Sequence, residues 1–533
     1  MDAIAEPGTS LSEPRTQRSG VSGEPCNCTA YSASRLGPYT VAFIALLLVT
    51  CPLFLYGLAD RELISSHEAR AGQNAQMVLD TGDWLLPRLL DGHVELQKPP
   101  MYYWMVAAIG WLNGGHVDAW AIRLPAALSA LACVLFLYLL GVQCRRPVAG
   151  LVAALVLASS LHFTWLARVG RIDMPLTAAI TVALGCFHVG TLDGKCKWKW
   201  HGIGYAAIAI GILLKGPIAI FLPALVVVAA VYLGSWDGSP EPSGRVRRPV
   251  LRGSSLGWGI PLMMLLAAPW FVWANVRTDN QFFETFFWFH NVERGLGSEV
   301  LKAHPWWFYF AHAPFDLLPW TLVVPVAMIY MLRKPELRGD LALRLGLIWF
   351  GAVFVFLSCM SFKRADYLLP AFPGLAIFLG ACAEAWWRQD HSDRARRFAV
   401  SGLGAVLAMC IAGWLVHTTW FLSAEERDWP YRRMAAEIRQ QTTGAVVFFQ
   451  AESHPLAFHL GHPVTTVLEW ENLQWWCDRD KPIYIVMPEA TAAEWRAHLG
   501  SEALVEVLHS SDFLRSSHPI AVFRNRGKPP ANP

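Results

Sequence analysis

Long apolar segments recur along most of this chain, and they constrain its fold more than any other feature. A transmembrane helix needs about 20 apolar residues, because its backbone must cross a hydrocarbon core about 30 Å thick. Charged residues make up only 16% of the chain, against about 25% in soluble domains. The sequence therefore predicts a polytopic α-helical membrane protein with about 11–13 transmembrane helices. The predicted spans cover residues 39–58, 122–143, 148–168, 174–190, 203–214, 217–234, 255–276, 306–331, 342–360, 367–387 and 397–421.

The two ends of the chain differ from this apolar region, 39–421. Residues 1–38 are rich in Gly, Pro, Ser, Thr and Arg and contain no apolar run, which predicts a disordered cytoplasmic tail. No cleavable signal peptide is visible, so we expect the first span to be an uncleaved anchor. Residues 422–533 alternate strand-like runs, such as AVVFFQ at 445–450, with helical stretches, which predicts a small soluble α/β domain.

The basic residues predict how the spans are oriented. The apolar segment Met101–Leu112 is too short to cross a bilayer. If it lies at the interface as an amphipathic helix, the short basic loops fall on the side of the N-terminal tail. The positive-inside rule assigns that side to the cytosol. We therefore expect the large first loop, 59–121, and the C-terminal domain to lie outside the cytosol.

This topology brings the unusual polar residues to the outer face. They come from the loop Ser66–Tyr103, the turn Arg168–Asp173, Lys215, the loop 277–305 and the segment Phe362–Asp366. The spans themselves carry few charges, of which Asp316 is the clearest. An ion-coupled transporter would usually carry carboxylates at mid-depth in the membrane. The pattern favours a site at the outer membrane surface.

Two carboxylates are candidates for a general base at this face. Glu68, in the motif SHEAR, follows the first span and has His67 and Arg70 beside it. It could accept a proton, or it could belong to a solvated loop start. Asp173 lies at the mouth of a later span, with Pro175 in the first helical turn. It could cap that helix, and capping is compatible with catalysis.

Several side chains are candidates for binding a phosphate. Lys98 follows Gln97 and precedes two prolines that fix the backbone, which suits a lysine acting as a point charge on phosphate. It could also extend to lipid headgroups. The other candidates, each of which could be an interfacial anchor instead, are Arg70, Gln97, Arg171, Lys215, His290, Arg294 and Lys363.

Other functions find little support in the sequence. The net charge of +3 is small and dispersed, which argues against nucleic acid as a partner. The pair Cys26 and Cys28 is a weak metal signal because structural zinc sites need four ligands, and His290 and His304 lack metal-type spacing. There is no GxGxxG, Walker A or HExxH motif. We therefore predict no metal site and no required cofactor.

Taken in order, seven motifs resemble a known family. They are the EAR loop, GDWLLPRLLDGHVELQKPP followed by YYW, RIDMPLT, LLKGP, FFWFHNVERGLGS, HPWWFY, and SFKR followed by DYLLPAFPG. Their order is similar to that of the GT-C glycosyltransferases (glycosyltransferase family 39), which include 4-amino-4-deoxy-L-arabinose transferase and the protein O-mannosyltransferases. The resemblance covers residues 40–375. The segment QAESHPLAFHLGHPV is similar to the C-terminal domain of the bacterial arabinose-transferase branch.

The resemblance implies a GT-C fold and an enzyme that moves a sugar from a polyprenyl-phosphate carrier to a lipid or protein acceptor, with inversion. Lys98 and Asp173 match the family pattern. His67 stands where the family usually has Asp, its presumed base, and Gln97 stands where it has Glu. These departures leave three possibilities: the base has passed to Glu68, His67 accepts the proton itself, or the activity is altered or lost.

Two other classes of function stay open at this stage. One is a flippase or other transporter of lipid-linked saccharides, against which the long first outer loop and the few mid-membrane charges argue. The other is a non-catalytic membrane scaffold that binds partners through the outer domain, which the departures at His67 and Gln97 allow. The sugar and the acceptor, such as lipid A, another glycolipid or a protein, cannot be read from the motifs.

Overall fold

The fold was taken from a computed structural model. It describes residues 36–63, 65–192, 196–233, 255–293, 303–422, 431–441, 445–451, 453–508 and 520–526. The disordered tail predicted at the N-terminus, with Cys26 and Cys28, lies almost wholly outside these residues; helix α1 begins at Leu36.

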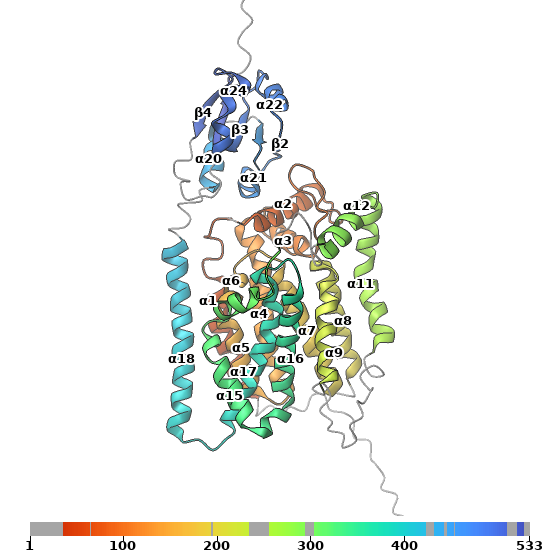
Figure 1. Ribbon diagram of the computed structural model, residues 1–533, viewed down its shortest axis with the longest axis vertical. Helices are drawn as coiled ribbons and strands as arrows, with labels where there is room; N and C mark the ends of the chain where they lie inside the picture. The colour runs from red at the N-terminus through yellow and green to blue at the C-terminus, as the bar shows by residue number, and fades with distance from the viewer. Residues whose placement is uncertain are drawn as a thin grey trace, which may run out of the picture.

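Helices dominate the structure and form a long bundle, with a small α/β domain above one end (Figure 1). Every apolar segment predicted to span the membrane is helical. The bundle contains α1 (Leu36–Leu55), α4 (Ala119–Gln143), α5 (Pro147–Ser159), α6 (Leu161–Ala167), α7 (Asp173–Leu192), α8 (Lys197–Lys215), α9 (Ile218–Tyr232), α11 (Leu256–Arg277), α14 (Phe308–Asp316), α15 (Val324–Arg333), α16 (Leu341–Cys359), α17 (Phe372–Trp387) and α18 (Asp393–Val416).

The lengths of these helices define a multi-pass membrane protein. Within the described residues, seven helical segments are long and apolar enough to cross a membrane, and nine if each of two bent pairs counts as one span. The bent pairs are α5 with α6, at 71°, and the helices of 308–333, at 109°. The other two predicted spans correspond to α8 and to the shorter α9. The chain is therefore an integral multi-pass membrane protein.

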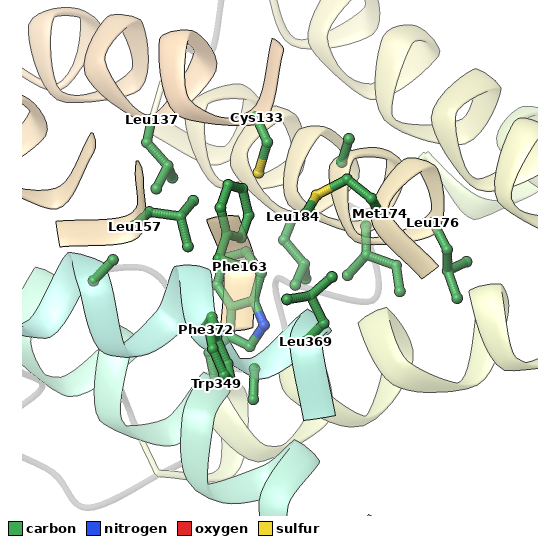
Figure 2. Packing of buried hydrophobic residues seen from close by; sticks show 14 of the residues in the cluster. Cys133, Leu137, Leu157, Phe163, Met174, Leu176, Leu184, Trp349, Leu369 and Phe372 are labelled. Atoms are coloured by element: carbon green, nitrogen blue, oxygen red, sulfur yellow. The ribbon is translucent and has the colours of Figure 1, made fainter. Parts of the chain in front are cut away.

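Helix α7 lies at the centre of the bundle, where it packs against α4 and α8. Phe163 is fully buried in this core, and Figure 2 shows Leu157, Leu369 and Phe372 around it. Small residues let the helices approach closely, as is common between membrane helices. A Cβ added at Gly150 of α5 would lie only 2.8 Å from the Cα of Gly141 in α4. The α4–α5 contact thus depends on both glycines.

Two helices lie at the end of the bundle below the α/β domain (Figure 1). They are α2 (Ser66–Thr81) and α3 (Met101–Leu112), which pack against each other. The chain leaves α2 at Gly82, whose φ of 70° suits glycine. It returns to α3 through Pro99 and Pro100. The predicted short helix Met101–Leu112 is present, and it forms part of the layer that covers this end of the bundle.

The C-terminal residues form a five-stranded mixed sheet in the order β2-β1-β3-β5-β4. Strands β1, β2 and β3 are parallel, while β5 is antiparallel to β3 and to β4. The predicted strand-like run at 445–450 contains β1, and the strand-like runs that the sequence also shows, PIYIVM at 482–487 and AVFRNR at 521–526, overlap β3 and β5. The strands are β1 (Val446–Phe449), β2 (Thr465–Val467), β3 (Tyr484–Pro488), β4 (Leu504–Leu508) and β5 (Ile520–Asn525). Helices α20 (Tyr431–Gln441), α21 (His454–Leu460), α22 (Trp470–Cys477), α23 (Glu489–Ala492) and α24 (Trp495–Leu499) complete the domain.

The α/β domain contacts the rest of the molecule through α21, which packs on α2. The Nε2 atom of Gln73 donates to the carbonyl of His454 at 3.0 Å. The ring of Phe458 is so close to Gly72 that an added Cβ would lie 2.5 Å from it. His459 and Glu62 approach to 2.5 Å. The domain therefore lies on the outer side of α2.

We expect Gly150→Leu to destabilise the protein, because the larger side chain would push α4 and α5 apart. Overpacking of this kind typically costs about 1–3 kcal/mol. The measurement is the thermal unfolding midpoint of the detergent-purified protein. The matched control is Gly404→Leu on α18, where an added Cβ meets nothing within 4 Å. An equal midpoint for the two variants would show that the α4–α5 contact is not tight.

Candidate active site

A pocket of about 220 Å³ lies at the end of the bundle where α2 and α3 cover it. One wall is apolar and is built by residues of α9, α16 and the helix η2 (Glu284–Glu293). The opposite wall is polar. Six of the residues predicted to form a site line this pocket: His67, Gln97, Lys98, Arg171, Asp173 and Lys215. Arg364 and Tyr367 line it as well.

Asp173 is the one carboxylate among the described residues that line the pocket. Helix α7 begins at this residue, so its side chain sits at the mouth of the bundle. It pairs with Lys215, the last residue of α8, at 2.5 Å. The Lys215 ammonium group also lies over the ring of Tyr367, 4.1 Å from its centroid. Segments far apart in the sequence therefore meet at this carboxylate.

His67 lies between two cations. Its Nδ1 is 3.2 Å from the Lys98 Nζ, and its Nε2 is 3.3 Å from an Arg364 guanidinium nitrogen. Burial and the nearby positive charges, that of Lys98 first among them, lower the pKa of His67 to about 2, so the ring is neutral. A neutral imidazole has one acceptor nitrogen. It can therefore satisfy only one of the two cations as a hydrogen-bond acceptor.

Burial lowers the pKa of Lys98 to about 8, with Glu95 opposing that shift and Arg70 adding to it. Pro99 and Pro100 follow Lys98 directly and restrict the backbone that carries it into the pocket. Arg70 does not line the pocket, since its guanidinium pairs with Glu95 at 2.8 Å. Arg70 thus acts on the pocket through its charge.

Asp366 holds the two pocket arginines. Its carboxylate accepts from Arg171 and lies 3.4 Å from Arg364. Behind it, the His162 ring lies 3.4 Å from Asp366 and 3.6 Å from Asp316. Asp316, the clearest charged residue within the predicted spans, is therefore paired with His162, behind the pocket.

Glu68 does not fit the role of general base. Its carboxylate has no exposed surface and does not line the pocket. It accepts hydrogen bonds from Arg123 at 2.8 Å, Arg61 at 3.0 Å and the Gly170 amide at 2.8 Å. Burial alone would raise the pKa of Glu68, but the charges of Arg123 and Arg61 hold it at about 2. This arrangement gives Glu68 a structural role.

The remaining candidates are not in the pocket lining. Lys363 donates to the backbone carbonyls of His304 and Met360, and the adjacent Arg364 lines the pocket in its place. Arg294 and the side chain of His290 lie outside the described residues. In the described part of the chain, no group of three or more His, Cys, Asp or Glu side chains could hold a metal.

Sequence reasoning missed three contributors to this site. Arg364 stands next to Lys363 in the same motif, and only the local turn decides which of the two faces the pocket. Arg61 and Arg123 bind Glu68 from 7 and 55 residues away, and no sequence motif connects them. Charged residues at the ends of predicted spans are the one signal that could have pointed to them.

Comparison with known proteins finds relatives of this chain. The family model for dolichyl-phosphate-mannose-protein mannosyltransferase matches residues 97–243. An undecaprenyl phosphate-alpha-4-amino-4-deoxy-L-arabinose arabinosyl transferase of Shewanella sediminis is 29% identical over 61% of this chain and 57% of its own length. The corresponding protein of Pectobacterium carotovorum is 27% identical over 68% and 62%. The matched region thus spans less than two thirds of these relatives.

Solved structures extend the likeness to the whole fold. ArnT from Cupriavidus metallidurans bound to undecaprenyl phosphate has a TM-score of 0.74 at 21% identity, over 92% of this chain and 98% of that one. The Archaeoglobus fulgidus oligosaccharyltransferase has a TM-score of 0.55 at 12% identity, over 89% and 73%. The fold is therefore the GT-C membrane fold with a small C-terminal α/β domain. The matched segment and the fold are similar to those of the GT-C glycosyltransferases, which include the 4-amino-4-deoxy-L-arabinose transferases and the protein O-mannosyltransferases.

We expect Glu68→Gln to destabilise the protein strongly, because it leaves the Arg123 and Arg61 charges without their shared anion. Breaking one partner of a buried pair typically costs about 3–5 kcal/mol. The measurement is the thermal unfolding midpoint at neutral pH, with Glu437→Gln on the exposed Arg433 pair as the control. A midpoint equal to that of the control would contradict the structural role of Glu68.

The same pair predicts a pH dependence. The pKa of Glu68 is depressed in the folded protein, from 4.5 to about 2. Its contribution to stability is therefore present above about pH 4.5 and is lost as the pH falls toward about 2. Unfolding midpoints measured across this range should fall more steeply for the wild-type protein than for Glu68→Gln. Parallel curves would exclude the depressed pKa.

Proposed function

We propose that this protein transfers a sugar from a polyprenyl-phosphate carrier to an acceptor on the extracytoplasmic side of a bacterial inner membrane. The observation that carries the proposal is the pocket itself. It combines one carboxylate, Asp173, with four cationic side chains and an apolar wall, at one end of a membrane bundle. The resemblance to relatives named for undecaprenyl-phosphate-dependent arabinosyl transfer supports it.

The two walls suit the two parts of such a donor. The apolar wall, which includes Leu222, Phe286 and Phe356, offers a surface to the first isoprene units. The cations of the polar wall offer charge-assisted hydrogen bonds to the phosphate, and Lys98 and Arg364 are the two that meet at His67. This arrangement would place the anomeric carbon between the phosphate and Asp173.

In the proposed step, a hydroxyl or amine of the acceptor attacks the anomeric carbon from the side opposite the phosphate. The new bond forms as the bond from the anomeric carbon to the phosphate oxygen breaks, and the polyprenyl phosphate leaves with that electron pair. The acceptor loses its proton to Asp173, and the configuration at the anomeric carbon inverts. Lys98, Arg171 and Arg364 stabilise the charge that develops on the leaving phosphate.

Asp173 is a better candidate for the base than His67. The pKa of His67 near 2 makes protonation of its ring unfavourable while the cations around it have no anion bound. Asp173 lines the pocket directly, and its carboxylate pairs with Lys215. The chemistry needs no metal, because cationic side chains act on the phosphate.

The acceptor is a lipid or a protein at the outer membrane surface. The positive-inside pattern of the sequence supports this location for the pocket and the α/β domain. The Archaeoglobus oligosaccharyltransferase and the Cupriavidus ArnT share the fold of this chain. A lipid acceptor is favoured by the matches to arabinosyl transferases, so modification of lipid A or a related cell-envelope glycolipid is the first acceptor to test.

We expect Asp173→Asn and Lys98→Met to lower turnover by about 100-fold or more, since general base catalysis and charge stabilisation contribute at that level. The measurement is transfer of radiolabelled sugar from a panel of undecaprenyl-linked donors into lipid and protein acceptors, with the protein in proteoliposomes. Asp480→Asn and Lys481→Met, on the exposed surface of the α/β domain, are the matched controls.

Each alternative predicts a different result. A transporter of lipid-linked saccharides would move the donor across the vesicle membrane without forming a product. A scaffold would do neither, and the Asp173 and Lys98 variants would behave like the wild-type protein. Product formation that survives Asp173→Asn would remove this carboxylate as the base.

A further inference from the structure

The surroundings of His67 carry more positive charge than a single phosphate needs. Four cations act on the ring through their charges: Lys98, Arg171, Arg364 and Arg70. Lys98 and Arg364 contact it directly, at 3.2 and 3.3 Å. His67 is neutral in this setting and cannot balance them. An anion bound beside His67 would meet Lys98, Arg171 and Arg364, which line the pocket, and would be attracted by the charge of Arg70.

The carboxylates near the pocket do not balance these charges. Glu95 pairs with Arg70, Asp173 pairs with Lys215, and Asp366 is shared between Arg171 and Arg364. Lys98 has no carboxylate within ion-pair distance among the described residues. Gln97, which also lines the pocket, is uncharged. Five cations therefore face three carboxylates, and two positive charges are left over.

This excess has a physical consequence for the ligand. A buried cation without a counter-charge is unfavourable, so the pocket is most stable with an anion of matching charge bound. The phosphate that joins a neutral sugar to a polyprenol is a diester and carries one negative charge. It would neutralise only half of the excess. Lys98 and Arg364 approach the two ring nitrogens of His67, so two cationic groups are close enough together to attract two neighbouring negative charges.

We propose that the donor of this protein carries two negative charges, the second of them close to the phosphate at the anomeric carbon. The proposal rests on the proposed glycosyl transfer and names the class of its donor. Two kinds of molecule share this chemistry: a sugar linked through a polyprenyl diphosphate, and an acidic sugar, such as a uronic acid, linked through a polyprenyl monophosphate.

The bond changes are the same for both donors. The acceptor oxygen or nitrogen bonds to the anomeric carbon as the bond from that carbon to the phosphate oxygen breaks. The leaving group is polyprenyl diphosphate in the first case and polyprenyl phosphate in the second. It takes the electron pair, and the acceptor proton goes to Asp173. No oxidant, reductant or metal enters the balance.

The test compares three undecaprenyl-linked donors with the purified full-length protein in proteoliposomes that contain the acceptor fraction. They are a monophosphate-linked neutral hexose, a monophosphate-linked uronic acid and a diphosphate-linked neutral hexose. We expect kcat/KM for one of the dianionic donors to exceed that for the neutral monophosphate donor by about tenfold or more. The donor that is preferred identifies where the second charge lies.

Charge-changing variants test the cause. His67→Asp and Gln97→Glu each add a negative charge to the pocket, and both should reduce the preference for the dianionic donor, mainly through KM. His67→Asn removes the ring but keeps the charge, so it should retain the preference even if turnover falls. Gln474→Glu adds the same charge on the exposed α22 and should leave the preference unchanged.

The outcomes separate this inference from the proposed function. Equal or better use of the neutral monophosphate donor would overturn the dianionic donor and leave glycosyl transfer in place. A preference among the three donors that depends on the charge of the acceptor, and not on the charge of the donor, would also overturn the dianionic donor. The absence of transfer from all three donors, with the protein folded, would overturn the proposed function itself.

Discussion

The buried ion pair of Glu68 is the interaction on which the site depends. One carboxylate joins Arg61 of the first loop, Arg123 of α4 and the amide of Gly170. Arg123 in turn donates to the carbonyls of Leu58, Arg61 and Glu62. These contacts fix the start of α2 against the bundle, and with it His67, the residue that precedes Glu68. Gly170 is three residues before Asp173, so the same carboxylate also positions the mouth of α7.

This arrangement separates the functions of two adjacent residues. His67 and Glu68 are neighbours at the start of a helix, where successive side chains point about 100° apart. One therefore faces the pocket and the other the bundle. The space behind α2 is tight, since a Cβ at Gly170 would lie 2.5 Å from Ile122. Charge on Glu68 stabilises the fold, and the absence of charge on His67 changes what the pocket can bind.

The sequence predicted the helices well and the site in part. The apolar runs at 203–214 and 217–234 were enough to predict helices there, because the hydrophobicity of a segment can be read from its own residues alone. The predicted topology also brought Lys98, Asp173 and Lys215 to one face, because Lys98 stands in the large outer loop and the other two stand at the ends of spans. It could not predict that Glu68 is sealed by Arg123, because that contact depends on how α2 packs on α4. Nor could it choose Arg364 over Lys363, because the turn between α16 and α17 sets which side chain points inward.

The histidine at position 67 changes the net charge of the pocket as well as the identity of the general base. A carboxylate there would pair with Lys98 and Arg364 and would neutralise part of the pocket before any donor arrives. The imidazole leaves both cations available, and Gln97 adds no charge to replace the missing one. The affinity of the pocket for an anion should therefore increase, while the base for the reaction must come from elsewhere. Asp173 meets that need because its carboxylate lines the pocket and pairs with Lys215, not with Lys98 or Arg364.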